Sequence, residues 1–115
     1  MEDNKVNFFE DLPKLNIKFL VQEQVRICRD CYLNITEDGD LADEARHERA
    51  VNMLWDFVDD FADPKSRTQL IHLNKRNRVR LDQAESDIQR GQIKAEHTRQ
   101  KFKVIMRLLR RLNWV

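Results

Sequence analysis

Glycine and proline are scarce in this sequence of 115 residues, which contains two of each. Average usage would give roughly eight glycines and six prolines at this length. Sandwiches and barrels of β-strands need a tight turn every eight to twelve residues or so, and those turns draw on both residue types. The scarcity therefore argues strongly against an all-β fold. With 41% hydrophobic and 36% charged residues, the sequence instead indicates an all-α protein.

Long apolar runs and a cysteine-rich pattern are also missing. No run approaches the roughly 18 apolar residues that a bilayer-spanning helix needs, and residues 1–5 do not begin a secretory signal. Two cysteines are too few for a disulfide-stapled scaffold. We therefore expect a cytoplasmic protein, or a nuclear one if its source is eukaryotic, without a membrane partner.

Motifs that would indicate catalysis are absent as well. The sequence contains no Gly-rich phosphate-binding loop and no nucleophile motif, and its three histidines are scattered through polar segments. Glu44 and His47 form one Glu-x-x-His step, but di-iron bundles need a second such step and further carboxylates. We therefore expect neither enzymatic activity nor a cofactor.

Cys28 and Cys31 form a Cys-x-x-Cys pair that could, together with His47, supply three ligands to zinc. Zinc-binding domains normally contain a second pair at a matching distance, which this sequence lacks. A thioredoxin-like role needs a preceding strand, whereas this pair falls within a predicted helix. The prediction is two reduced thiols without a metal, although the sequence alone leaves a three-ligand site open.

The apolar spacing and the capping signals predict about four helices, over residues 12–33, 41–62, 65–89 and 92–113. Asp11 and Asp63 are the predicted N-caps of the first and third helices, because a proline follows each within the first turn. Residues 1–10 are predicted to be a polar lead-in anchored by Phe8 and Phe9, and residues 34–40 to be a loop.

The first two predicted helices carry broad apolar faces. We expect the first helix to be largely buried, because two rows of apolar residues share one side of it. These rows are Val21, Val25, Cys28, Tyr32 and Ile35, and Ile17, Leu20, Ile27 and Cys31. In the second helix the stripe is Ala50, Leu54, Phe57 and Phe61, flanked by Val51, Trp55 and Val58.

The last two predicted helices carry narrower seams. One is coiled-coil-like, with Asn77 as a polar interruption of the kind that fixes register. A lone glycine, Gly91, costs only about 1 kcal/mol inside a helix, so a hairpin and one continuous helix both remain open. We predict a single helical domain over residues 1–115, a bundle with a long C-terminal hairpin or helix. The two seams are Leu70, Asn77, Leu81, Ala84 and Ile88, and Ala95, Thr98, Phe102, Ile105, Leu109 and Leu112.

The net charge of +1 conceals two oppositely charged halves. Residues 1–64 carry 16 acidic and 7 basic side chains, a net charge of −9, whereas residues 65–115 carry 4 and 14, a net charge of +10. Four acids collect near the C-terminal end of the second predicted helix, where the helix dipole disfavours negative charge. We therefore expect basic partners close to them. These acids are Asp56, Asp59, Asp60 and Asp63.

The basic half suggests the leading hypothesis for function. A row of four cations at steps of 4, 4 and 3 lies beside the last apolar stripe, and four more cations cluster on the preceding helix. Such rows suit phosphate backbones. We therefore expect a small interaction protein that binds nucleic acid or a nucleoprotein complex. The row is Arg99, Lys103, Arg107 and Arg110, supported by Lys75, Arg76, Arg78 and Arg80.

Two alternatives remain open. The basic half could neutralise the acidic half, within one molecule or across a homodimer, because charge runs are usually solvated or paired. Alternatively, the acidic surface could imitate phosphates and bind a protein partner as an adaptor or inhibitor, with no role in nucleic-acid binding. Ion pairs would then orient the partner, while Trp55 and Trp114 would supply the apolar anchors.

Overall fold

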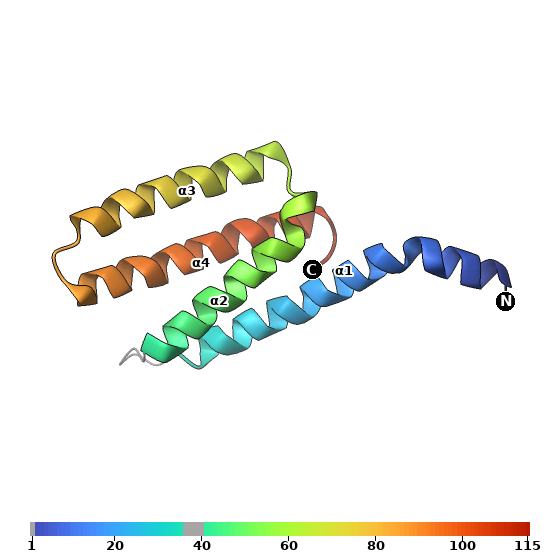
Figure 1. Ribbon diagram of the computed structural model, residues 1–115, viewed down its shortest axis with the longest axis horizontal. Coiled ribbons are helices and arrows are strands. Elements are labelled where there is room, and N and C mark those ends of the chain that lie inside the picture. Colours follow the sequence, from blue (N-terminus) through green and yellow to red (C-terminus); the bar gives the residue numbers. More distant parts are fainter. Residues whose placement is uncertain (1, 36–40) are drawn as a thin grey trace.

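The computed structural model describes the backbone of residues 2–35 and 41–115 and the side chains of residues 17–35 and 42–115. Its elements are all helical, and no strand occurs in these ranges, so the predicted all-α class is confirmed (Figure 1). The helices are α1 (Glu2–Leu33), α2 (Leu41–Val58), α3 (Pro64–Gln83) and α4 (Asp87–Arg111), with a 3₁₀ turn (Asp59–Phe61) after α2.

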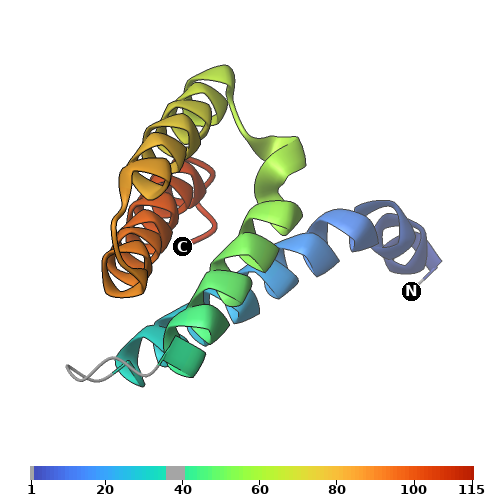
Figure 2. The ribbon, with the colours of Figure 1, turned by 60° about the vertical axis from the view of Figure 1, so that its left-hand side comes forward.

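The helices form two antiparallel pairs, α1 with α2 and α3 with α4 (Figures 1 and 2). The pairs are joined where α2 packs against α4. The N-terminal turns of α1 run beyond the other helices (Figure 1). The C-terminal half is therefore a hairpin, which decides between the two arrangements that the sequence left open.

The main core lies where α1, α2 and α4 meet, and it is built from the predicted apolar stripes. Because residues three and four apart share one helix face, each stripe delivers its side chains to the same side. The α4 stripe is confirmed, since its members are all buried or half-buried. The largest fully buried side chains of this core are Val21, Val51, Leu54, Val58, Ile105 and Leu109.

Helix α1 differs from its prediction in two respects. It begins at Glu2 and continues through Asp11 and Pro13, so the predicted lead-in and the N-cap at Asp11 are wrong. The helix persists although a proline removes one of its backbone hydrogen bonds. The helix is also less buried than expected: Leu20 and Ile27 of the second apolar row and Tyr32 of the first are exposed, whereas Ile17 and Cys31 pack against the core. The predicted anchor residues, Phe8 and Phe9, have side chains outside the described residues.

The predicted start of α3 is confirmed. The Asp63 carboxylate accepts hydrogen bonds from the Ser66 backbone N–H at 3.4 Å and from the Ser66 hydroxyl at 2.6 Å, and Pro64 occupies the first helical position. These contacts satisfy a backbone donor that has no partner within the helix. Helix α2 ends at Val58, earlier than predicted, because the chain tightens into the 3₁₀ turn.

The predicted boundary between the last two helices is wrong. The break falls at residues 84–86, and Gly91 lies inside α4. Ser86 is the N-cap: its hydroxyl accepts a hydrogen bond from the Gln89 backbone N–H at 3.1 Å, and Gln89 Oε1 accepts one from the Glu85 N–H at 3.0 Å. The first bond is that of a capping box, whereas in the second Gln89 accepts from Glu85, the residue before the cap, and not from Ser86 itself. Ile88 therefore leaves the α3 seam and is 77% exposed.

Asn77 is buried between α3 and α4, as its place in the predicted seam requires. Its side-chain amide donates to the Leu73 carbonyl at 2.9 Å, and its Oδ1 accepts from Arg80 at 3.4 Å. Both ends of the amide are thus satisfied, which is the condition for burying a polar side chain without a large cost.

Candidate functional site

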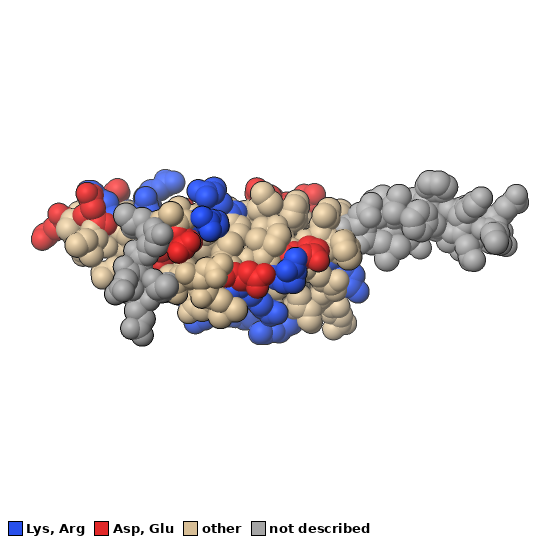
Figure 3. Space-filling model, turned by 90° about the horizontal axis from the view of Figure 1, so that it is seen from below, with Lys and Arg blue, Asp and Glu red and all other residues tan. Residues whose placement is uncertain are grey.

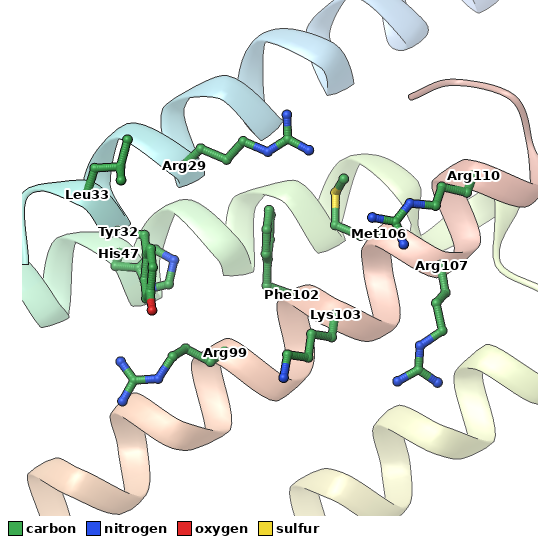
Figure 4. Close-up of a pocket in the computed structure, with 10 residues that line it drawn as sticks. All are labelled: Arg29, Tyr32, Leu33, His47, Arg99, Phe102, Lys103, Met106, Arg107 and Arg110. Atoms are coloured by element: carbon green, nitrogen blue, oxygen red, sulfur yellow. The ribbon is translucent and has the colours of Figure 1, made fainter.

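A pocket of about 640 Å³ opens between α1 and α4, with α2 behind it (Figure 4). Its volume lies within the range of small-molecule sites in proteins. Half of its ten lining residues are cationic and stand on two helices. We call these five residues the basic rim: Arg29 from α1, and Arg99, Lys103, Arg107 and Arg110 from α4.

The four α4 members of the basic rim are the row that the sequence singled out. At a rise of about 1.5 Å per residue they extend over about 16 Å of the helix, at intervals of about 6, 6 and 4.5 Å. The fold sets Arg29 of α1 across the pocket from them (Figure 4). The row is therefore one side of a recess that has cations on both sides.

Most of the basic rim has no internal counter-charge. Arg99 lies 3.9 Å from the Glu44 carboxylate, at the limit of an ion pair. Arg29, Lys103, Arg107 and Arg110 form no ion pair with any carboxylate of residues 17–35 and 42–115. Because like charges gathered around one recess repel each other, an anion placed there would stabilise the arrangement.

The floor of the pocket is apolar and aromatic. The rings of Tyr32 and His47 lie 5.6 Å apart between centroids, and those of His47 and Phe102 lie 6.5 Å apart in an edge-to-face arrangement. Three helices supply this floor (Figure 4). Its residues are Tyr32, Leu33, His47, Phe102 and Met106.

His47 is the most buried polar residue of the pocket, at 2% exposed, and its Nδ1 atom has no hydrogen-bond partner. Burial, and next the positive charge of Arg99, lower the pKa of this imidazole, so the ring is neutral at pH 7. Glu44 Oε2 is also buried without a partner. A buried polar atom without a partner costs free energy and calls for an explanation, such as a bound group that completes its hydrogen bonding.

The α3 cations that the sequence grouped with this row do not join the pocket. Arg76 donates to Gln100 Oε1 at 3.1 Å, and Arg80 forms an ion pair with Glu96 at 3.2 Å, so both connect α3 to α4. The hydrogen bond from Arg80 is the largest cause that lowers the pKa of Glu96. The other two cations, Lys75 and Arg78, are exposed and lie outside the lining of the pocket.

The expected basic partners of the acidic cluster are present for two of its members. Asp59 pairs with Arg67 and Asp63 with Arg111, each at 3.1 Å. The pKa of Asp63 is lowered, chiefly by the hydrogen bond from the Ser66 side chain. The remaining two acids, Asp56 and Asp60, are exposed and form no ion pair within the described part of the chain, although the charge of Asp56 acts on the nearby Lys101.

The two predicted apolar anchors are half-buried within the protein itself. Trp55 packs against the core, and Trp114 packs edge-to-face on Phe61 with ring centroids 5.0 Å apart. The Trp114 carbonyl also accepts a hydrogen bond from Gln22 of α1 at 2.9 Å. Both indoles therefore already contribute to holding the helices together, which reduces the apolar area they can offer to a partner.

Among the described residues on one face of the molecule, the division into an acidic and a basic half is not repeated. On the face in Figure 3, acidic and basic side chains lie next to one another. Folding brings cations of the C-terminal half beside acids of the N-terminal half, as in the pairs Arg111–Asp63 and Arg99–Glu44. Four cations of the basic rim are among those that form no ion pair within the described residues.

The Cys-x-x-Cys pair lies on α1 and flanks the rim residue Arg29, but neither cysteine lines the pocket. Cys28 is fully buried, and burial raises the pKa of its thiol to about 12, while Cys31 is half-buried. Within the described residues, no three His, Cys, Asp or Glu side chains are grouped closely enough to hold a metal ion. The same residues contain no helix that is sufficiently long and apolar to cross a membrane.

The sequence predicts the α4 row of the pocket but not the lining residues that come from α1 and α2. Arg29 and Tyr32 are three residues apart and so lie near each other on α1, but nothing local in the sequence says that α4 faces them. The sequence patterns around His47 suggest only a metal ligand. Comparisons with protein-family models, with curated proteins and with solved structures found no match to this chain.

Proposed function

We propose that this protein binds nucleic acid, alone or within a nucleoprotein complex, through the basic rim. One observation carries the proposal: five cations from two helices surround a single pocket, and four of them have no carboxylate partner among the described residues. An enzymatic role has no comparable support, because no nucleophile with an activating base lines the pocket.

A phosphate backbone fits this arrangement better than an isolated anion does. The α4 cations recur about every 4.5–6 Å along the helix axis, so several of them can contact phosphates of one strand at the same time. Cations at this spacing displace condensed counterions together, and arginines add paired hydrogen bonds to phosphate oxygens. The affinity would therefore come from several weak contacts that act along one polyanion.

The test compares two triple variants of equal charge change. The rim variant is Lys103→Gln, Arg107→Gln and Arg110→Gln, and the control is Arg49→Gln, Lys75→Gln and Arg78→Gln, which changes exposed cations outside the pocket. Binding of labelled single-stranded and duplex DNA and RNA is measured by fluorescence anisotropy at about 50 mM salt and above. We expect the rim variant to lose binding at least tenfold and the control to lose much less.

The salt dependence provides a second readout. If about four phosphates are neutralised, log affinity falls with log salt at a slope near −2.8 for a single strand or −3.6 for a duplex. No binding of any nucleic acid at low salt would refute the proposal, as would equal losses in both variants. Circular dichroism of each variant confirms that the helices are retained.

A further inference from the structure

We propose that the pocket receives one unpaired base of a single-stranded nucleic acid while the neighbouring phosphates lie on the basic rim. This inference deepens the proposed function and rests on it. It concerns the form of the nucleic acid, single-stranded over duplex, and assigns a role to the floor of the pocket that phosphate contacts do not require.

The charged surface is concave, which favours a single strand. The recess has cations on both sides, Arg29 on α1 and the row on α4, although the Arg107 guanidinium points away from α1 (Figure 4). A duplex turns its phosphates outward and keeps its bases stacked inside, so it could contact the rim but would leave the recess empty. A single strand can turn a base toward the protein while its phosphates follow the cations.

The floor of the pocket carries aromatic rings on which a base could stack. Tyr32 is 48% exposed although Val25 and Cys28, which precede it in the same apolar row, are buried, so part of its ring is available to a ligand. Phe102 lines the same pocket and lies edge-to-face to His47. Aromatic side chains in a positively charged groove are the usual means by which proteins hold unpaired bases, because every base offers a flat face for stacking.

His47 has a ring nitrogen without a hydrogen-bond partner. Its Nδ1 atom is buried, lacks a partner and belongs to a residue that lines the pocket. A neutral imidazole can either donate or accept at this position, depending on the tautomer. The edge of a base carries both donors and acceptors and could complete this bond once the imidazole turns toward the recess, whereas an aliphatic chain could not.

Simpler ligands account for only part of the site. An inorganic anion would use the cations and leave the apolar floor without a function. An uncharged apolar molecule would fill the floor and leave five cations around it without a partner. A base that is attached to phosphates uses both, which is why we infer this chemical class.

The experiment compares a labelled oligothymidylate of about twelve nucleotides with the same strand in a duplex, against two variants of α1. Tyr32→Ala removes an aromatic ring from the pocket, and the matched control, Phe19→Ala, removes an exposed ring outside it. We expect the wild type to bind the single strand at least tenfold more tightly than the duplex. Tyr32→Ala should weaken single-strand binding about tenfold and leave duplex binding unchanged, while Phe19→Ala changes neither.

The outcomes separate this inference from the proposed function. Equal affinity for both forms, or no selective effect of Tyr32→Ala, overturns the base pocket while rim-dependent binding survives. Failure to bind either form at low salt refutes the proposed function, and the base pocket with it. Binding to anionic phospholipid vesicles in place of nucleic acid would likewise overturn both, and would assign the pocket to a lipid headgroup.

A measurement on the unmodified protein avoids any effect of mutation on folding. The imidazole nitrogen resonances of His47 are followed by NMR while the oligothymidylate is added, with those of the exposed His72 as an internal control. A hydrogen bond to Nδ1 should shift its resonance selectively. Tight binding without a change at His47 would contradict the proposed hydrogen bond from the base.

Discussion

The ring of Tyr32 on α1 lies 5.6 Å from the ring of His47 on α2, and the two planes are inclined by 49°. The contact stands at one end of the pocket (Figure 4). Tyr32 follows Val25 and Cys28 at the spacing of a core residue, yet it remains half exposed because the core ends there and the recess begins. The floor of the pocket therefore continues the hydrophobic core and lies directly beside a row of cations.

Two isoleucines of α4 provide a matched test of the fold. Ile105 is fully buried and Ile88 is 77% exposed, although both lie in the same helix. Ile105→Ala should lower the free energy of unfolding by about 2–5 kcal/mol, because it removes buried methyl groups and leaves a cavity. Ile88→Ala should change it by less than about 0.5 kcal/mol. Urea denaturation checks both, and similar losses in the two variants would be inconsistent with the described core.

Ser86 tests the observed boundary between α3 and α4. Ser86→Ala removes the hydroxyl that accepts a hydrogen bond from the Gln89 backbone and should cost about 1 kcal/mol. Ser86→Asp keeps an acceptor at the cap and should restore most of the loss. If α3 and α4 were instead one helix that continued to Gly91, Ser86→Ala would be neutral or stabilising, because alanine is the better residue in a helix interior.

Stability should fall when the pH is lowered from about 7.5 to 5.5. The pKa values of His47 and His97 are lowered, chiefly by burial, so the unfolded chain binds protons in this range that the folded protein does not. The stabilising contribution is therefore fully present above the ordinary histidine pKa of about 6.5 and is lost progressively as the pH falls from there through the lowered pKa of the folded protein.

The pH effect can be assigned by substitution. His47→Phe should lose less stability on acidification than the wild type, whereas the exposed His72→Phe should lose about as much as the wild type. Thermal unfolding at the two pH values provides the comparison. An unchanged pH dependence in His47→Phe would show that His47 does not carry the effect.

The two cysteines should differ in reactivity. Cys28 is fully buried and its thiol has a pKa of about 12, so it carries almost no thiolate at neutral pH. A thiol reagent at pH 8 should label Cys31 first in the native protein and reach Cys28 only on unfolding. Equally rapid labelling of both, measured by mass spectrometry, would contradict the burial of Cys28.

Much of the fold follows from local sequence patterns, and the misplaced features have identifiable causes. The α4 stripe and the Asp63-Pro64 start of α3 were predictable because spacing and capping act within a few residues. Ser86 and Gln89 have the spacing of a capping box, which indicates a helix start at Ser86. The predicted break lay at Gly91 instead, because glycine is the more familiar sign of a helix end. Local signals do not reveal how much of α1 the other helices cover, so the exposure of Leu20 was not foreseen.

The candidate site was predictable only in its α4 half. The row that includes Lys103 and Arg107 lies on one helix, so its periodicity is visible in the sequence. Arg29, Tyr32 and His47 reach the same pocket from other helices through the packing of α1 and α2 around α4, and no spacing rule connects them. Which cations are neutralised internally, as Arg111 is by Asp63, likewise depends on tertiary contacts.

The most direct test of the central claim is the salt dependence of single-strand affinity, measured for the wild type and for the rim variant Lys103→Gln, Arg107→Gln and Arg110→Gln. With about four phosphates neutralised, we predict a slope of log affinity against log salt near −2.8 for the wild type and near −0.7 for the rim variant, which keeps about one such contact. Equal slopes for the two proteins, or no binding at about 50 mM salt, would contradict the assignment of the basic rim as the nucleic-acid contact.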